Sequence, residues 1–137
     1  MIRRRIKLLA ILGCLLIVLA GCSKKWVILG TAAAAVGVGA YAYIRGDLKR
    51  TYDVNIEKAW AASVKSVEEL KLTTESKAHD AFTGNIKGKM ADGTSFEINL
   101  KRVGENTTEV GIRLGTFGDR PKSEAIHDKI LANLKTS

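Results

Sequence analysis

Hydrophobic and polar positions change their spacing several times along the chain, and each spacing predicts a different kind of element. An uncharged apolar run covers residues 8–20, and a second covers residues 26–44. From residue 56 to residue 70 apolar side chains recur every three or four positions, which predicts an amphipathic helix. Over residues 82–114 apolar and polar residues alternate, which predicts strands with one buried face.

Two helices are predicted, each with a capping residue. Asn55 precedes the first, and its side chain can accept hydrogen bonds from the first helical N–H groups. Trp60 belongs to the apolar face of this helix, so we expect it to lie in the core rather than to bind a ligand. Asp119 can cap the second helix, and Pro121 is tolerated in its first turn. The apolar stripe of that helix consists of Ala125, Ile126, Ile130 and Leu134.

One strand is predicted before the first helix and four strands are predicted after it. They are predicted at residues 48–54, 70–77, 82–90, 94–102 and 108–114. Turns containing glycine, at residues 91–93 and 104–106, connect the last three. The order strand, helix, four strands, helix predicts an α+β fold, in which two helices cover one face of an antiparallel sheet of about five strands.

Two glycines interrupt the apolar face of the strand at residues 82–90. Gly84 and Gly88 would leave room for a large side chain from a covering helix, such as Trp60. A gap between sheet and helices at these glycines would alternatively admit a lipid or another hydrophobic ligand. The sequence leaves both interpretations open.

Three Arg and one Lys precede the first apolar run. Its last two residues and the two that follow form the sequence Leu19-Ala20-Gly21-Cys22. As a helix the 13 residues of the run would span about 20 Å, less than the ~30 Å hydrocarbon core of a bilayer. This pattern resembles the signal peptide and lipobox of bacterial lipoproteins, in which only Cys offers the thiol for diacylglyceryl transfer. We therefore predict a signal peptide at residues 1–21, cleavage between Gly21 and Cys22, and lipidation of Cys22, rather than an uncleaved anchor.

The lipoprotein resemblance also implies where the protein is located. It implies a thioether-linked diacylglycerol on Cys22 and an acyl chain on the new amine, which together should anchor the chain permanently. Ser23, rather than Asp, follows the cysteine. In lipoproteins of two-membrane envelopes this implies the outer membrane, with the folded domain facing the periplasm.

The second apolar run, residues 26–44, would span about 29 Å as a helix, close to one bilayer core. Ala and Gly supply nine of its 19 residues, at spacings that allow helices to pack closely. We expect a helix inserted in or lying on the membrane, through which copies of the chain could self-assemble. A helix packed on the folded domain and a flexible tether are the alternatives. The chain thus divides into a signal peptide, a lipidated Gly/Ala-rich segment at residues 22–46 and a domain at residues 47–137.

The formal charge of +8 comes mainly from the N-terminal segment. Six of the 22 Lys and Arg residues precede residue 26, and residues 45–137 contain 16 basic and 14 acidic side chains. We therefore expect no nucleic-acid partner. Cys14 would leave with the signal peptide and Cys22 would be lipidated, so the mature domain would have no disulfide and no thiolate nucleophile.

Candidate catalytic and binding residues are few. His79 and His127, the only histidines, belong to no spaced ligand set, and we expect both on the surface. The sequence therefore predicts no enzyme, no cofactor and no metal site. We expect a non-enzymatic envelope lipoprotein with a structural role or an unknown envelope protein or lipid as partner. The candidate partner-binding surface is the polar face of the sheet, formed by Asn85, Lys87, Glu97, Asn99, Lys101 and Arg113.

Four stretches carry a wider resemblance. They come in addition to the lipobox. The first is residues 41–52, at the end of the Gly/Ala-rich segment, and the others are Ala59-Trp60, residues 91–94 and residues 112–119. On these residues the chain resembles a family of short bacterial lipoproteins defined as a domain of unknown function. The resemblance implies the lipid anchor and the small α+β architecture, and it implies no activity and no binding residue beyond Cys22.

Overall fold

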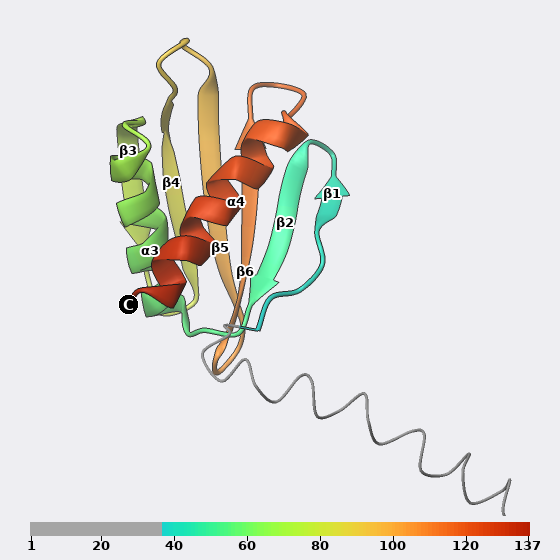
Figure 1. The fold of residues 1–137 in the computed structure, drawn as a ribbon, viewed down its shortest axis with the longest axis vertical. Coiled ribbons are helices and arrows are strands. Elements are labelled where there is room, and N and C mark those ends of the chain that lie inside the picture. The colour runs from blue at the N-terminus through green and yellow to red at the C-terminus, as the bar shows by residue number, and fades with distance from the viewer. Residues whose placement is uncertain (1–36) are drawn as a thin grey trace, which may run out of the picture. The chain divides into compact units, whose positions relative to one another are not determined.

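The computed structural model describes residues 37–137, which contain six antiparallel strands and two helices (Figure 1). The elements are β1 (Ala42–Ile44), β2 (Asp47–Tyr52), α3 (Ile56–Glu69), β3 (Thr73–His79), β4 (Thr83–Lys89), β5 (Ser95–Gly104), β6 (Thr107–Leu114) and α4 (Arg120–Lys135). The strands form one sheet in the order β1-β2-β6-β5-β4-β3. The predicted α+β class is confirmed.

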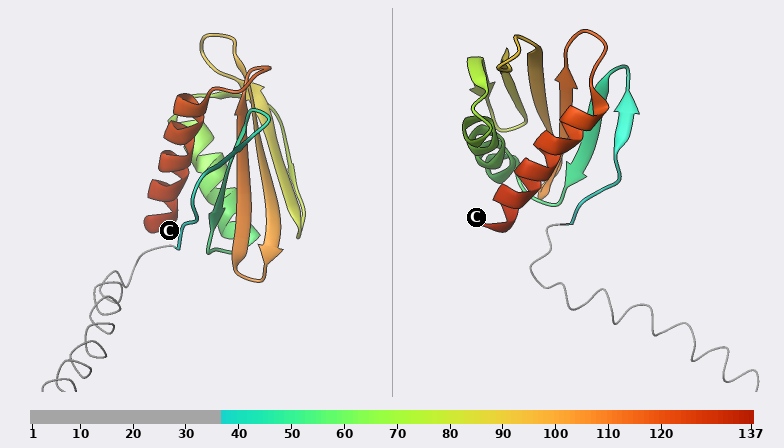
Figure 2. Two further views of the ribbon diagram at one scale, coloured as in Figure 1. Left: turned by 90° about the vertical axis from the view of Figure 1, so that its right-hand side faces the viewer. Right: turned by 45° about the horizontal axis from the view of Figure 1, so that its top comes forward.

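Both helices lie on one face of the sheet, and the other face is left open (Figure 2). Helix α3 contacts β3, β4, β5 and β6, while α4 contacts α3, β2 and β6. The core lies between these two layers, and its fully buried side chains include Leu48, Tyr52, Ile98, Val110, Ile112 and Ile130. The alternation in the sequence therefore separates a buried face from an open polar face, as predicted.

The predicted caps of both helices are confirmed. Asn55 accepts a hydrogen bond from the backbone N–H of Lys58 (2.9 Å), and Asp119 accepts one from that of Lys122 (3.1 Å). β3 begins at Thr73, three residues later than predicted. The residues before Thr73 still belong to the end of helix α3. Lys71 adopts a φ of 55°, and its N–H bonds to the carbonyl of Glu68, so the chain becomes extended only after it.

The sheet has six strands rather than about five, because part of the second apolar run is extended. β1 pairs with β2, and Val38 forms a bridge with Tyr52. The predicted helix at residues 26–44 is therefore wrong over residues 37–44, where backbone hydrogen bonds run to β2 and to Asp53. The domain boundary predicted at residue 47 falls inside this first hairpin.

The rest of the N-terminal predictions lie outside the described residues. They are the signal peptide at residues 1–21, cleavage after Gly21, lipidation of Cys22 and residues 26–36 of the second apolar run. Within residues 37–137, neither helix combines the length and the apolar character that crossing a bilayer would need.

Trp60 fills the space that Gly84 provides, as predicted. A Cβ atom at Gly84 would lie 2.9 Å from Cε3 of Trp60, which is too close for a carbon contact. A Cβ at Gly88 would lie 2.8 Å from Cε1 of Phe96 and would overlap the backbone carbonyl of Thr73. Both glycines therefore permit close packing, and protein atoms occupy the space beside them.

Candidate functional site

The candidate residues come together on the open face of the sheet, on β4, β5 and β6. The strand register sets Asn85 opposite Asn99, Lys87 opposite Glu97, and Glu97 opposite Arg113. Lys101 lies opposite Glu109 on β6. Because each of these positions alternates with a buried one, the sheet holds all six residues on one surface.

Hydrogen bonds link the centre of this polar surface. The side-chain amide of Asn85 donates to Oε1 of Glu97 (2.8 Å) and to Oδ1 of Asn99 (2.6 Å). Nζ of Lys87 lies 3.2 Å from the same Oε1. Partial burial raises the pKa of the Glu97 carboxyl, but the hydrogen bonds from Asn85 and Lys87 outweigh it, so the net pKa is lowered. Glu97 is therefore held ionised and oriented.

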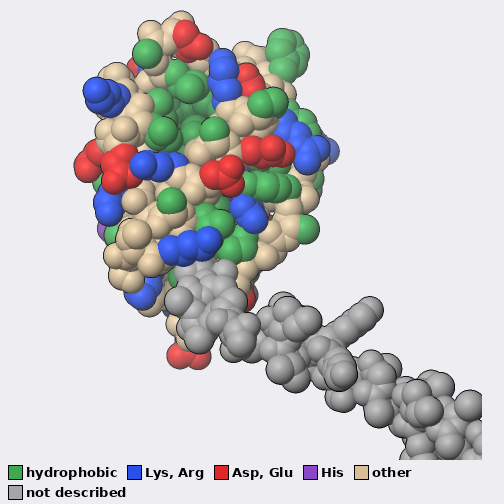
Figure 3. All heavy atoms as spheres, viewed as in Figure 1, with side chains coloured by type: hydrophobic (Ala, Val, Ile, Leu, Met, Phe, Trp, Pro, Cys, Tyr) green, Lys and Arg blue, Asp and Glu red, His purple; other side chains and the backbone are tan. Residues whose placement is uncertain are grey.

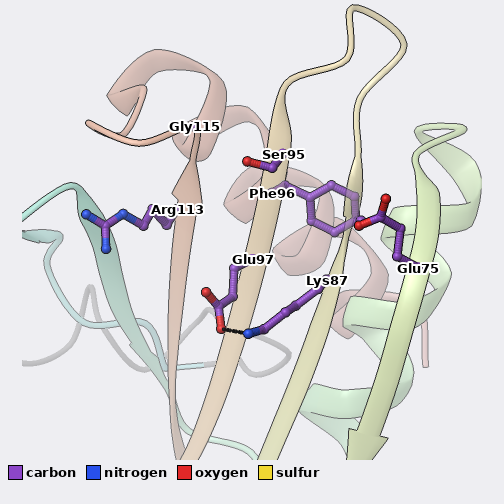
Figure 4. A pocket seen from close by; sticks show the side chains of 8 residues that line it. Glu75, Lys87, Ser95, Phe96, Glu97, Arg113 and Gly115 are labelled. Atoms are coloured by element: carbon purple, nitrogen blue, oxygen red, sulfur yellow. Dashed lines mark ion pairs between the residues drawn. The ribbon is translucent and has the colours of Figure 1, made fainter.

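Arg113 has a different role from the one predicted by its position. Its guanidinium points away from the Lys87–Glu97 pair (Figure 4). Nη2 donates to the backbone carbonyls of Arg45 (3.0 Å) and Thr116 (3.1 Å), which lie in two separate loops. Arg113 thus joins these loops at one end of the sheet, where it also lines the edge of the open face.

Two hollows lie beside the candidate residues. One has a volume of about 180 Å³ and is lined by Glu75, Lys87, Gly88, Ser95, Phe96, Glu97, Arg113 and Gly115 (Figure 4). Its volume is below the roughly 300–1,000 Å³ of small-molecule pockets. The other, of about 460 Å³, includes Asp80, Asn85, Asn99 and Lys101 in its lining. Ala78 and Leu100 line it as well, so this hollow places apolar groups beside charged and amide ones, as the interface with a partner protein does.

Sequence reasoning missed the ion pairs that extend this surface. Lys49 of β2 forms an ion pair with Glu109 of β6 (3.1 Å), and Glu75 of β3 forms one with Lys89 of β4 (3.4 Å). Glu109 and Lys89 belong to the polar positions of the predicted alternation, and only their role in ion pairs was not predicted. The ion pairs give the surface alternating charges rather than a single sign.

The prediction that His127 lies on the surface is wrong. Its side chain is fully buried between the sheet and α4. Nε2 lies 2.9 Å from the carbonyl oxygen of Leu48, and Nδ1 lies 2.8 Å from the hydroxyl of Tyr52. Because the carbonyl can only accept, Nε2 carries the hydrogen and Nδ1 accepts from Tyr52. The ring is buried because this neutral tautomer satisfies both of its nitrogens.

Burial shifts both side chains of this pair away from ionisation. It lowers the pKa of His127 from 6.5 to about 4, although the hydrogen bond to Leu48 opposes the shift. Burial likewise raises the pKa of the Tyr52 hydroxyl above its ordinary value of 10.0, despite the nearby guanidinium of Arg50. Both groups are therefore neutral near pH 7, in a position remote from the open face.

His79 is largely exposed, as predicted, and packs against α3. Its ring stacks on that of Trp60, with centroids 4.4 Å apart, and Nε2 lies 3.3 Å from Oε2 of Glu57. Among residues 37–137, no three His, Cys, Asp or Glu side chains gather where they could hold a metal ion. The two histidines thus contact structural neighbours rather than each other.

A family model covers both the described domain and most of the segment before it. The model of the family described as "Protein of unknown function (DUF3568)" matches residues 5–133. This chain belongs to the DUF3568 family. No curated protein matches the sequence of this DUF3568 protein. The description of the family assigns no activity to the open face.

Proposed function

We propose that this DUF3568 protein is a lipid-anchored protein of the bacterial envelope, without enzymatic activity, whose domain binds another envelope protein. The observation that carries the proposal is Leu19-Ala20-Gly21-Cys22 after a basic and then apolar segment. Ser23 favours retention at the outer membrane, with the domain in the periplasm. Cys22 is the residue to which lipid is attached, and other enzymes carry out that reaction.

The open face of the sheet is the surface we assign to the partner. It is wide, its glutamate and lysine side chains alternate, and Asn85 already holds Glu97 and Asn99 in fixed positions. Alternating charges favour a partner protein with the complementary pattern, because complementary charges give specificity more than affinity. The 180 Å³ hollow beside Phe96 and Gly88 is of a size to receive a side chain of that partner.

The non-enzymatic character rests on how the described histidines are used. His127 is held neutral in the core by Tyr52 and Leu48, and His79 stacks on Trp60 beside Glu57. Each is accounted for by packing, and the hydroxyl beside His127, that of Tyr52, is fully buried in the core, where a substrate could not reach it.

The structure gives less support to the two alternative functions. The side chain of Trp60 and the backbone of Thr73 take up the space beside Gly84 and Gly88, where a hydrophobic ligand would have to enter. A self-assembling membrane helix would be confined to residues 26–36, since residues 38, 39 and 42–44 pair or hydrogen-bond with β2 and Gly37 accepts from Asp53. Eleven helical residues span only about 16 Å, roughly half of the hydrocarbon core.

Mass spectrometry tests the anchor. The protein purified from bacterial membranes should begin at Cys22 and carry the added mass of a diacylglycerol and an acyl chain. Cys22→Ala should yield an unprocessed chain without lipid. Cys14→Ala is the matched control, because it removes the other cysteine and should leave processing unchanged. A Cys22→Ala chain that is cleaved and released normally would refute the anchor.

Site-specific crosslinking tests the partner surface. A photo-reactive amino acid at Asn99, in the middle of the open face, should give one discrete crosslinked protein in intact cells. The same amino acid at Ala132, an exposed position of α4 on the other side of the domain, is the control. Equal crosslinking at both positions, or none at Asn99, would contradict a binding role for the open face.

A further inference from the structure

Two loops meet at one end of the sheet and form a single rigid tip. One is the β1–β2 turn at Arg45 and Gly46, and the other is the β6–α4 loop at residues 115–118. The guanidinium of Arg113 bonds to one backbone carbonyl in each loop. We call Tyr43, Ile44, Arg45, Thr116 and Phe117 the tip.

Glycines allow the two loops to touch backbone to backbone. Gly46 and Gly118 both have positive φ angles, of 89° and 80°. A Cβ atom at Gly46 would lie 2.7 Å from the carbonyl oxygen of Phe117, and one at Gly118 would overlap the backbone of Gly46. The hydroxyl of Tyr43 also donates to the carbonyl of Phe117 (3.3 Å). The backbone that carries Phe117 is therefore held in place from several sides.

This rigid tip presents apolar side chains to solvent. Phe117 is 90% exposed, Ile44 is 52% exposed and Tyr43 is 43% exposed. Figure 3 shows hydrophobic side chains protruding at the end of the domain where these loops lie. Because Arg113 and the two glycines fix the backbone beneath Phe117, this exposure is built into the fold rather than a result of a loose loop.

We propose that the tip is a second contact with the membrane, which turns the anchored domain so that Phe117 and Ile44 enter the lipid interface. This proposal rests on the lipid anchor at Cys22. Residues 22–36 comprise 15 residues, which reach up to about 50 Å when extended. The chain enters the domain beside Tyr52, and the six residues of β2 lead from there to the tip over about 20 Å. The tip is thus within reach of the bilayer that holds Cys22.

The composition of the tip fits a phospholipid surface. Phe and Ile supply apolar area, Tyr43 is a residue type that concentrates at membrane interfaces, and the exposed Arg45 can face headgroup phosphates. Two apolar side chains cannot hold a soluble protein on a bilayer, since even one myristoyl chain binds only marginally. A chain that is already anchored needs only a weak contact to favour one orientation, because its effective concentration at the surface is high.

The opposite end of the sheet is less suited to this contact. It also exposes apolar side chains, Phe82 at 66% and Val103 at 53%. Carboxylates lie at both ends, but Asp92 and Asp119 at the tip end are both paired with Lys122 (3.5 Å each). At the opposite end the exposed carboxylates of Asp53, Asp80 and Glu105 would face anionic headgroups. Phe82 is therefore a matched control for Phe117.

Fluorescence quenching by lipid tests the contact. The full chain carrying Cys14→Ala is coupled through Cys22 to a maleimide phospholipid and placed in vesicles of phosphatidylethanolamine and phosphatidylglycerol with brominated acyl chains. Phe117→Trp should add a blue-shifted, strongly quenched emission to that of Trp26 and Trp60. Phe82→Trp should add an unquenched one.

The outcomes separate the tip from the anchor. The maleimide lipid imposes the anchor chemically, so the quenching reports on the tip whether or not cells lipidate Cys22, which mass spectrometry decides independently. A Phe117→Trp emission that stays unquenched and water-like in these vesicles would overturn the proposal. Equal quenching of Phe82→Trp would also overturn it, because the domain would then lack the proposed orientation.

Discussion

The hydroxyl of Tyr52 on β2 and the Nδ1 atom of His127 on α4 lie 2.8 Å apart in the buried layer between sheet and helix. The other ring nitrogen of His127 donates to the carbonyl of Leu48, also on β2. One neutral imidazole thus ties the C-terminal helix to a strand near the start of the domain. This arrangement has consequences for stability that can be measured.

The first consequence is sensitivity to mild acid. The pKa of His127 is about 4 in the folded protein and about 6.5 when the chain unfolds. Between these values the unfolded state binds a proton that the folded state does not, so the free energy of unfolding falls as pH decreases from 6.5 towards 4. We expect a loss of about 3 kcal/mol over the whole window, measurable by urea denaturation at several pH values.

A variant separates His127 from other titrating groups. His127→Gln should flatten the pH dependence above pH 5, because it removes the buried imidazole. Measurements above pH 5 avoid the carboxyls of Asp80, Asp92 and Glu97, whose pKa values are lowered and which take up protons at more acid pH. An unchanged slope in His127→Gln would show that the acid sensitivity has another source.

The second prediction concerns the hydroxyl of Tyr52. Tyr52→Phe removes the donor and leaves Nδ1 of His127 buried without a partner, which should cost about 1–3 kcal/mol of stability. Tyr43→Phe is the control, because its hydroxyl makes a longer bond in an exposed position and its loss should cost less than about 0.5 kcal/mol. If chemical denaturation showed that the two substitutions lower the free energy of unfolding equally, the hydrogen bond between Tyr52 and His127 would not have the predicted value.

The third prediction concerns the contact between Gly84 and Trp60. Gly84→Ala would place a Cβ 2.9 Å from the indole and should destabilise the fold by about 1–3 kcal/mol through overpacking. In a Trp60→Leu background the same substitution should cost clearly less, as a double-mutant cycle would show. Gly111→Ala is a matched control in β6, where the nearest atom would lie at an ordinary 3.5 Å. If the effects of Gly84→Ala and Trp60→Leu on the free energy of unfolding were additive, the two residues would not be in direct contact.

The parts of the fold that followed from the sequence are those with a periodic pattern. Alternation placed the candidate residues on one face, and the glycine on the apolar side of β4 pointed to Trp60. β1 was missed because Ala42–Ile44 end a long uncharged run in which a short strand has no polar alternation to reveal it. Its pairing depends on β2, which offers a free edge only once the sheet has formed.

The side-chain roles that escaped prediction depend on distant partners. His127 follows Ile126 on α4, and its burial depends on acceptors and donors of β2 that lie nearly 80 residues earlier. Arg113 alternates correctly for the open face, yet its length lets the guanidinium reach carbonyls of two loops at the end of the sheet. Periodicity gives the direction of a Cβ atom and not the end point of a long side chain.

The role of Arg113 can be separated from that of the open face. Arg113→Met keeps much of the side-chain length and removes the bonds to the carbonyls of Arg45 and Thr116. Hydrogen exchange of the backbone N–H groups at residues 115–118 should then become faster, and the free energy of unfolding should fall by about 1 kcal/mol, because both carbonyls can turn to water. Lys87→Met, which removes a charge from the open face, should leave exchange in this loop unchanged.

The same pair of variants links the loop to the membrane contact. If the fixed backbone is what presents Phe117, Arg113→Met should weaken the lipid quenching of Phe117→Trp, while Lys87→Met should not. Full quenching despite fast exchange would mean that Phe117 enters the interface without a rigid loop, and the contribution assigned to Arg113 would then be wrong. Slow exchange in Arg113→Met would instead mean that the glycine contacts between Gly46 and Gly118 hold the two loops together without it.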